Sequence, residues 1–243
     1  MRILNFAKRN FKEIIRDPLS IIFAIILPLF LLFIFQQIKI PNDTYNLENF
    51  TPGIMIFSFS FITLFSSTLI AKDRQTSLLI RLGVSPMKPI EYILGYMLSF
   101  LPIILLQGIL LFGLAIILGF PISMNIIWTI LVSEVIAVLF LGIGILIGSL
   151  VSDKAASGIS SIIVQLVCFT SGIYFPKELL GNTYSKICEI LPFDSALVII
   201  KGILNNNYET IKLQNIIVFC AYTVAFIIWS AIIFKRKMIS DNK

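Results

Sequence analysis

The sequence predicts an all-α membrane protein with six transmembrane helices, and three observations support that prediction. Of its 243 residues, 58% are hydrophobic and 13% are charged, about half the charged fraction of a typical soluble domain. Its mean hydropathy is +0.97. Six apolar runs are long enough to cross a hydrocarbon core of about 30 Å. We expect each run to be a helix, because backbone groups in lipid must bond within their own segment.

The six expected spans together form a transmembrane domain at residues 19–236, followed by a cytoplasmic tail at 237–243. The spans are about 20–38, 52–71, 93–120, 125–151, 157–175 and 215–234. Pro28 lies inside the first span and is expected to kink it.

Lysine and arginine give the expected orientation. With six spans the two termini share a side, and 14 of the 19 Lys and Arg residues fall on that side. Because cytoplasmic loops carry the excess of basic residues, both termini are predicted to lie in the cytoplasm, with the chain in the cell membrane. This bias also accounts for the net charge of +6, so no nucleic-acid partner is inferred.

Residues 1–18 are predicted to form an amphipathic helix ahead of the first span. Apolar side chains recur at helical spacing, and basic side chains lie between them. We expect this helix to lie in the cytoplasmic interface, with its basic residues near lipid headgroups. Arg16-Asp17-Pro18 then ends the helix and turns the chain into the bilayer.

The longest expected cytoplasmic loop follows the second span. Leu78, Leu79 and Leu82 share one face if this loop is helical, and Gly83 and Pro86 would end that helix. An apolar face outside the bilayer needs a surface to pack on. That surface is another part of the chain, the lipid surface or a partner.

The expected outer loop before the last span carries an apolar patch at 190–204, interrupted by Pro192. It is too short to cross a bilayer, so a re-entrant or interfacial segment is expected there.

The residues offer no catalytic or metal site. There is no histidine, and the three cysteines are scattered without metal-binding spacing. The phosphate-binding sequence Gly-x4-Gly-Lys-Ser/Thr occurs nowhere in the chain. We therefore expect no enzyme activity, no metal and no bound cofactor on this chain.

Polar residues inside the expected spans are the candidates for a substrate pathway. Glu134 is the only acid well inside a span, and it either marks a path or gate, or lies near headgroups or bonds to a neighbouring helix. Two polar stripes fit either helix packing or a pathway, namely Ser60, Thr63 and Ser67 in the second span, and Ser157, Ser161, Gln165 and Cys168 in the fifth. Gly144, Gly148 and Ser152 form a ladder of small residues that favours close helix packing.

Several motifs, taken in order, resemble those of the type-2 ABC exporter permeases, the membrane subunits of drug, antibiotic and polysaccharide exporters. The resemblance covers nearly the whole chain. Its motifs are Arg16-Asp17-Pro18, the run with Pro28, Pro52-Gly53-Ile54, Asp73-Arg74, Arg81-Leu82-Gly83-Val84-Ser85-Pro86, Glu91-Tyr92-Ile93-Leu94-Gly95, Ser171-Gly172-Ile173-Tyr174-Phe175-Pro176 and Leu191-Pro192-Phe193.

This resemblance implies a partner assembly. Two six-span subunits, identical or different, would pair and bind two copies of a separate ABC ATPase that carries the ATP and Mg²⁺. The loop near residues 75–85 would hold a coupling helix that contacts the ATPase, and the segment before the last span would be a re-entrant hairpin. The implied ATPase-coupling residues are Leu78, Leu79, Arg81, Leu82, Gly83 and Ser85.

The resemblance also implies a path between the two subunits, near the first, second and fifth spans. Candidate pathway residues are Ser60, Thr63, Ser67, Ser161, Gln165 and Glu134. The expected function is an ATP-driven exporter permease for a small hydrophobic drug, antibiotic or peptide. Two alternatives stay open: an ion-coupled secondary transporter that uses Glu134, and a non-transporting membrane immunity or scaffold protein.

Overall fold

The computed structural model describes residues 2–38, 43–76, 87–173 and 181–240. Within these ranges the chain is helical and contains no strand. The helices are α1 (Arg2–Ile15), α2 (Pro18–Ile21), the π-helical turn η1 (Ile22–Ile26), α3 (Leu27–Ile38), η2 (Asp43–Tyr45), α4 (Leu47–Gln75), α6 (Pro89–Ile117), α7 (Met124–Leu150), α8 (Asp153–Thr170), α9 (Asn182–Ile190), α10 (Pro192–Leu204), η4 (Tyr208–Thr210) and α11 (Leu213–Ser240).

Among the described residues, five helical segments are long and apolar enough to cross a membrane. They are Pro18–Ile38, Leu47–Gln75, Pro89–Ile117, Met124–Leu150 and Leu213–Lys237. The expected fifth of six spans corresponds to α8, which is not among these segments. It is 18 residues long but less apolar, because it begins with Asp153 and Lys154 and carries Gln165 and several serines.

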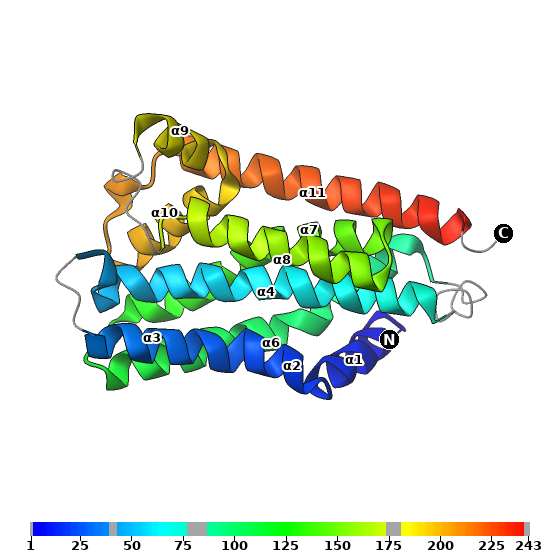
Figure 1. The fold of residues 1–243 in the computed structure, drawn as a ribbon, viewed down its shortest axis with the longest axis horizontal. Helices are drawn as coiled ribbons and strands as arrows, with labels where there is room; N and C mark the ends of the chain where they lie inside the picture. The colour runs from blue at the N-terminus through cyan, green and yellow to red at the C-terminus, as the bar shows by residue number, and fades with distance from the viewer. Residues whose placement is uncertain (1, 39–42, 77–86, 174–180, 241–243) are drawn as a thin grey trace.

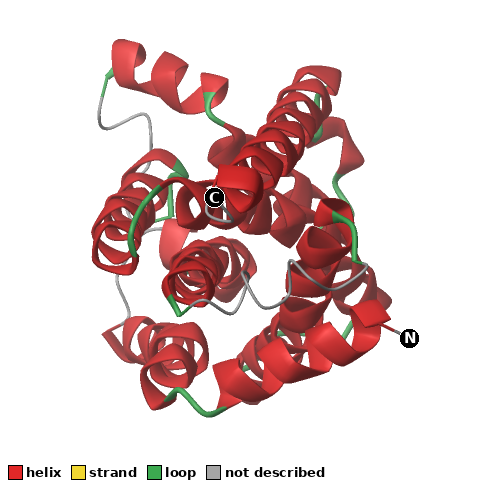
Figure 2. Ribbon diagram, turned by 90° about the vertical axis from the view of Figure 1, so that its right-hand side faces the viewer, coloured by secondary structure: helices red, strands yellow, loops and turns green. Residues whose placement is uncertain are grey.

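The long helices form one elongated bundle, with both termini at the same end (Figure 1). We call this the basic end, because α1, the α7–α8 turn and the end of α11 place Arg9, Lys154 and Arg236 there. Helices α9 and α10 lie at the opposite end (Figure 1). Figure 2 shows the bundle from the basic end, with α1 lying across its edge.

Helix α4 is the centre of the bundle and packs against α3, α6, α7, α8 and α10. Its many hydroxyl groups do not need water, because most of them donate to carbonyls of the preceding turn of α4 itself. Ser58 donates to Met55 O, Ser60 to Phe57 O and Ser67 to Leu64 O, at 2.6 to 2.9 Å. A helix with many serines can therefore be buried on nearly all sides.

The contact between α4 and α7 depends on small residues, as the sequence predicts. A Cβ added to Gly144 would lie 2.8 Å from Thr63 O, and one added to Gly148 would lie 3.0 Å from Cβ of Ile70. Ser152, the third member of the expected ladder, is different. It is exposed and sits at the N-cap of α8.

The first apolar segment is irregular beside Pro28. Proline lacks the N–H that would bond to a carbonyl of the preceding turn, and the helix here contains the π-helical turn η1. Gln107 of α6 donates from Nε2 to Ala24 O, four residues before Pro28, at 2.8 Å. A neighbouring helix thus satisfies backbone that the proline disturbs.

Helices α9 and α10 meet at Leu191, where Pro192 begins α10. Asn125, at the start of α7, donates to Leu204 O at the end of α10. Near the start of α10, the ring of Phe193 contacts that of Phe140, with centroids 5.8 Å apart. Because Phe140 lies fifteen residues beyond Asn125, α10 extends from the end of the bundle opposite the termini to about the middle of α7.

Candidate functional site

A buried ionic network joins three helices at the basic end. Asp73, near the end of α4, is only 1% exposed. Arg9 of α1 contacts both of its carboxylate oxygens, from Nη1 at 2.7 Å and from Nη2 at 2.9 Å. Tyr96 of α6 donates its hydroxyl to the same carboxylate at 2.8 Å. A two-point Arg–carboxylate contact fixes orientation as well as distance, so α1, α4 and α6 are held in one arrangement.

The interactions of Arg9 favour the protonated, positively charged form of its guanidinium. Partial burial lowers the pKa of its guanidinium, but the hydrogen bond and the negative charge of Asp73 raise it more, and Glu13 adds to that rise. Arg9 Nη2 also lies 2.6 Å from Glu13 Oε2. The net result is a pKa above the ordinary arginine value.

Aromatic packing holds α1 in place beside this network. The ring of Phe6 meets Tyr92 and Tyr96 edge-on, with centroids 5.3 and 5.0 Å apart. Gly95 makes this approach possible, because a Cβ there would lie 2.5 Å from the Phe6 ring. Helix α1 is therefore docked on α6 by ring packing and on α4 by charge.

The expected coupling loop lies outside the described residues. This applies to Leu78, Leu79, Arg81, Leu82, Gly83 and Ser85.

The two helices that flank this loop are well anchored. On α4, Asp73 is bound to α1 and α6, and Arg74 Nη1 donates to Gly148 O on α7 at 3.1 Å. On the other side, α6 is joined to α4 by the bond from Tyr96 to Asp73, and its own first turn is capped by Lys88 N, which donates to Glu91 Oε2 at 2.6 Å. The end of α4 is therefore bonded to α1, α6 and α7.

The structure separates the two predicted polar stripes. The stripe on α4 is internal: Thr63 donates to Phe140 O of α7 at 2.9 Å, and the Oγ atoms of Ser67 and Ser160 lie 2.7 Å apart. Ser60 is fully buried as well. These hydroxyls are satisfied within α4 or at its contacts with α7 and α8, so packing accounts for them.

The stripe on α8 faces outward. Helix α8 packs inward through Ala156, Ser160, Val164 and Val167, which recur at three- and four-residue spacing. Ser161 and Gln165 lie on the other side of the helix and are exposed. A polar face on a helix of a membrane bundle is poorly suited to lipid, so it calls for a protein or a water-filled surface opposite.

Glu134 is half-buried on α7. Its helix, α7, meets Gly108 of α6 through Ile130 one turn earlier, and Phe226 of α11 through Gly142 two turns later. Both carboxylate oxygens are buried, and no described residue donates a hydrogen bond to them. The expected bond to a neighbouring helix is not seen among the described residues, and a position near lipid headgroups stays a prediction.

Sequence reasoning missed the contact between Arg9 and Asp73. The two residues are 64 positions apart, and each also fits a simpler reading, as an interfacial cation and as a charge at a helix end. An acid placed directly after the apolar part of α4, ahead of Arg74, was the one available signal.

These features define a multi-pass helical membrane protein with a docked N-terminal helix and no catalytic constellation in the part of the chain described. A family model for the ABC-2 type transporter matches residues 2–205. The chain belongs to this family, and it is a membrane-embedded transport subunit, a permease, of an ABC transporter. A comparison with curated proteins found no match.

Proposed function

We propose that this chain is the permease of an ATP-driven exporter, paired with a second permease and powered by two copies of a separate ABC ATPase. One observation carries the proposal: both helices that flank the loop at 77–86 are bonded to other helices of the bundle, α4 through Asp73 and Arg74, and α6 through the bond from Tyr96 to Asp73. A partner that moves this loop would move α1, α6 and α7 with it.

The proposed topology has six membrane crossings, with α8 as the fifth. Eighteen residues give about 27 Å of helix, close to the hydrocarbon thickness. The placement of both termini at one end of the bundle requires an even number of crossings, which supports this count. Both termini lie in the cytoplasm of the cell, and α1 lies in the membrane interface.

Helices α9 and α10 form the proposed re-entrant segment on the outer side. The contacts at Asn125 and Phe140 place the two ends of α10 at different depths along α7. The proline between the two helices supplies the break that such a turn requires.

The substrate path runs along the outward face of α8. Ser161 and Gln165 supply polar groups there, and exposed Phe23 and Phe30 lie on the first span. A second permease, identical or different, would cover this face. ATP and Mg²⁺ bind to the partner ATPases, and ATP binding shifts the permease pair between two states with different contacts.

The cargo is a small hydrophobic drug, antibiotic or peptide. At the end of the bundle opposite the termini, the described segments outside the long helices are short: η2, α9 and η4 have three, nine and three residues. They are too small to form a domain that captures a polymer or a folded protein.

The test replaces the apolar face of the coupling loop. In Leu79→Asp or Leu82→Asp, the protein inserts normally, but the ATPase no longer co-purifies and export stops. Leu213→Asp is the matched control, because Leu213 is exposed at the far end of the bundle. Normal ATPase recovery with both loop variants would refute the proposed contact.

Ion-coupled transport is a second candidate, and the buried carboxyl of Glu134 favours it. Glutamine has the same shape without the ionisable proton. If Glu134→Gln abolishes export while the ATPase still binds and hydrolyses ATP, an ion-coupled step is supported. If export is unchanged, this second candidate is refuted.

A further inference from the structure

Helix α1 has three faces, and packing within the bundle uses only one of them. Phe6, Ala7, Asn10 and Ile14 are buried. Leu4 and Ile15 form an apolar face that is 64% and 47% exposed. A third face is cationic. Two of the three faces are therefore open to molecules outside the chain.

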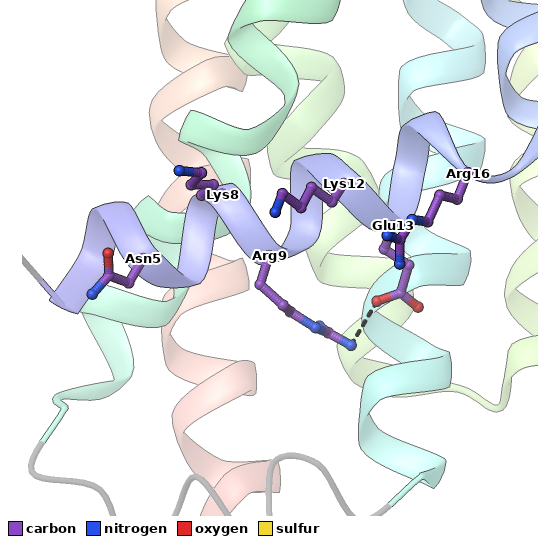
Figure 3. A pocket seen from close by; sticks show the side chains of 6 residues that line it. All are labelled: Asn5, Lys8, Arg9, Lys12, Glu13 and Arg16. Atoms are coloured by element: carbon purple, nitrogen blue, oxygen red, sulfur yellow. Dashed lines mark ion pairs between the residues drawn. The ribbon is translucent and has the colours of Figure 1, made fainter.

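The cationic face lines a concave surface of about 600 Å³ (Figure 3). The residues lining it are Asn5, Lys8, Arg9, Lys12, Glu13 and Arg16. Arg9 and Glu13 point toward each other and form an ion pair (Figure 3). Lys8, Lys12 and Arg16 are exposed and make no ion pair with any described residue, so three positive charges remain available to an anion.

An apolar recess of about 200 Å³ lies on the other side of the same helix. It is enclosed by α1, the α2–η1 segment, α4 and α6, and Ser20 is the one polar side chain among the described residues that line it. Exposed Ile15, Pro102 and Leu106 form its rim. The recess therefore opens at the outer surface of the bundle, at the depth where α1 meets the membrane-spanning helices.

A third cavity, of about 470 Å³, adjoins both. It shares Ile14, Ser20 and Phe65 with the recess, and Glu13 and Arg16 with the cationic face. Its charged residues are Arg16 and Lys72 together with Glu13, Asp17 and Asp153. Two of these acids have partners: Glu13 lies near Lys72 and Arg9, and Asp17 accepts from Ser20 and from Leu19 N.

We propose that these adjoining cavities form a binding site for one anionic glycerophospholipid, with its phosphate on Lys12 and Arg16 and an acyl chain in the recess. The choice of this ligand follows from the cationic face and the apolar recess taken together. A free anion would contact the cations but leave the apolar recess empty. An uncharged hydrophobic molecule would fill the recess but leave the three unpaired cations without a partner. A phospholipid supplies both parts in the order in which the cavities present them.

The test uses the purified full chain in uncharged detergent. The probes are dioctanoylphosphatidylglycerol, the zwitterionic dioctanoylphosphatidylcholine and inorganic phosphate, titrated against the midpoint of thermal unfolding. Lys12→Gln with Arg16→Gln removes the phosphate contacts. Lys235→Gln with Arg236→Gln, two exposed cations at the same end, is the charge-matched control. Leu106→Trp fills the mouth of the recess.

Phosphatidylglycerol raises the midpoint of the unaltered chain, and the other two probes do not. The Lys12/Arg16 variant binds phosphatidylglycerol more weakly, by about fivefold for each charge removed, and the control variant binds it normally. Leu106→Trp weakens this binding and leaves the midpoint without lipid unchanged, which shows that the fold is intact.

Four outcomes would overturn the proposal. An equal response to inorganic phosphate would mean that only a free anion binds. An equal response to phosphatidylcholine would mean that charge plays no part. If the Lys235/Arg236 control loses as much phosphatidylglycerol binding as the Lys12/Arg16 variant, the lipid responds only to the net charge of the protein and not to a specific site. If Leu106→Trp keeps its full helix content and binds phosphatidylglycerol as the unaltered chain does, the acyl chain does not occupy the recess.

Discussion

Arg9 on α1 contacts both carboxylate oxygens of Asp73 on α4, at 2.7 and 2.9 Å, although the two residues are 64 positions apart. Arg9 is partly exposed and Asp73 is almost fully buried. The contact therefore compensates a buried charge near the C-terminal end of α4, the most central helix. It also joins the N-terminal helix to the segment directly before the expected coupling loop.

Removing this contact should destabilise the bundle in a way that depends on both residues. Arg9→Gln leaves a buried carboxylate with one partner fewer, which is costly, whereas Arg9→Gln with Asp73→Asn removes the charge as well. A double-mutant cycle on unfolding in detergent should give a coupling of about 1–3 kcal/mol. Additive effects of the two single variants would mean that the contact contributes nothing.

The same contact should be insensitive to moderately alkaline pH. Because the pKa of Arg9 is raised on folding, its contribution is complete below the ordinary arginine pKa and is lost only as the pH rises through the higher folded value. The stability difference between the unaltered chain and Arg9→Gln should stay constant from about pH 7 to 10. A difference that disappears over this range would contradict the assignment.

Close packing of α7 on α4 predicts that alanine is harmful at two glycines. A Cβ at Gly144 or Gly148 meets backbone and side-chain atoms of α4, so Gly144→Ala and Gly148→Ala should each cost about 1–3 kcal/mol. Gly113→Ala is the control, because nothing lies within 4 Å of a Cβ there. Thermal unfolding midpoints would measure the effect. Equal midpoints for the three variants would refute the packing.

The bond from Gln107 to Ala24 O should support the irregular first segment. Gln107→Leu keeps most of the side-chain volume but removes the donor, and it should cost about 1–3 kcal/mol, because a buried carbonyl loses its partner. Gln165→Leu is the matched control on an exposed position of α8. If both variants unfold at the same temperature, the bond has no structural role.

The outward face of α8 should meet a second permease. In a background with Cys168→Ser, Cys188→Ser and Cys220→Ser, we expect Ser161→Cys to form a disulfide-linked pair of subunits in native membranes if the partner is a second copy. Val224→Cys, exposed on α11, should stay monomeric under the same oxidation. Cross-linking at Val224 and none at Ser161 would place the interface on another face.

Sequence patterns predicted the helical membrane fold because apolar runs of this length are typical of transmembrane helices. The close packing at Gly144 and Gly148 was predicted for a similar reason, since small residues four apart on one helix face favour contact. Polar side chains were harder to assign. Ser67 on α4 and Ser161 on α8 have the same local pattern, yet one faces a neighbouring helix and the other faces outward.

The difference between these two serines arises from tertiary packing. Helix α4 is surrounded by other helices, whereas α8 lies on the outside of the bundle. Local spacing carries no information about which helices will surround a given one. The same limit hid the contact between Arg9 and Asp73, which forms only after α1 folds back against α4 and α6.

The most direct test of the proposed function is ATP hydrolysis by the complex that the tagged chain retains. The chain, gently solubilised from its native cells, should co-purify with an ATPase subunit, and the complex should release phosphate from ATP. The Leu79→Asp variant, recovered in equal amount, should not co-purify with the ATPase subunit and should therefore show no ATP hydrolysis. Vesicles in which the purified permease alone moves cargo without ATP would contradict the account.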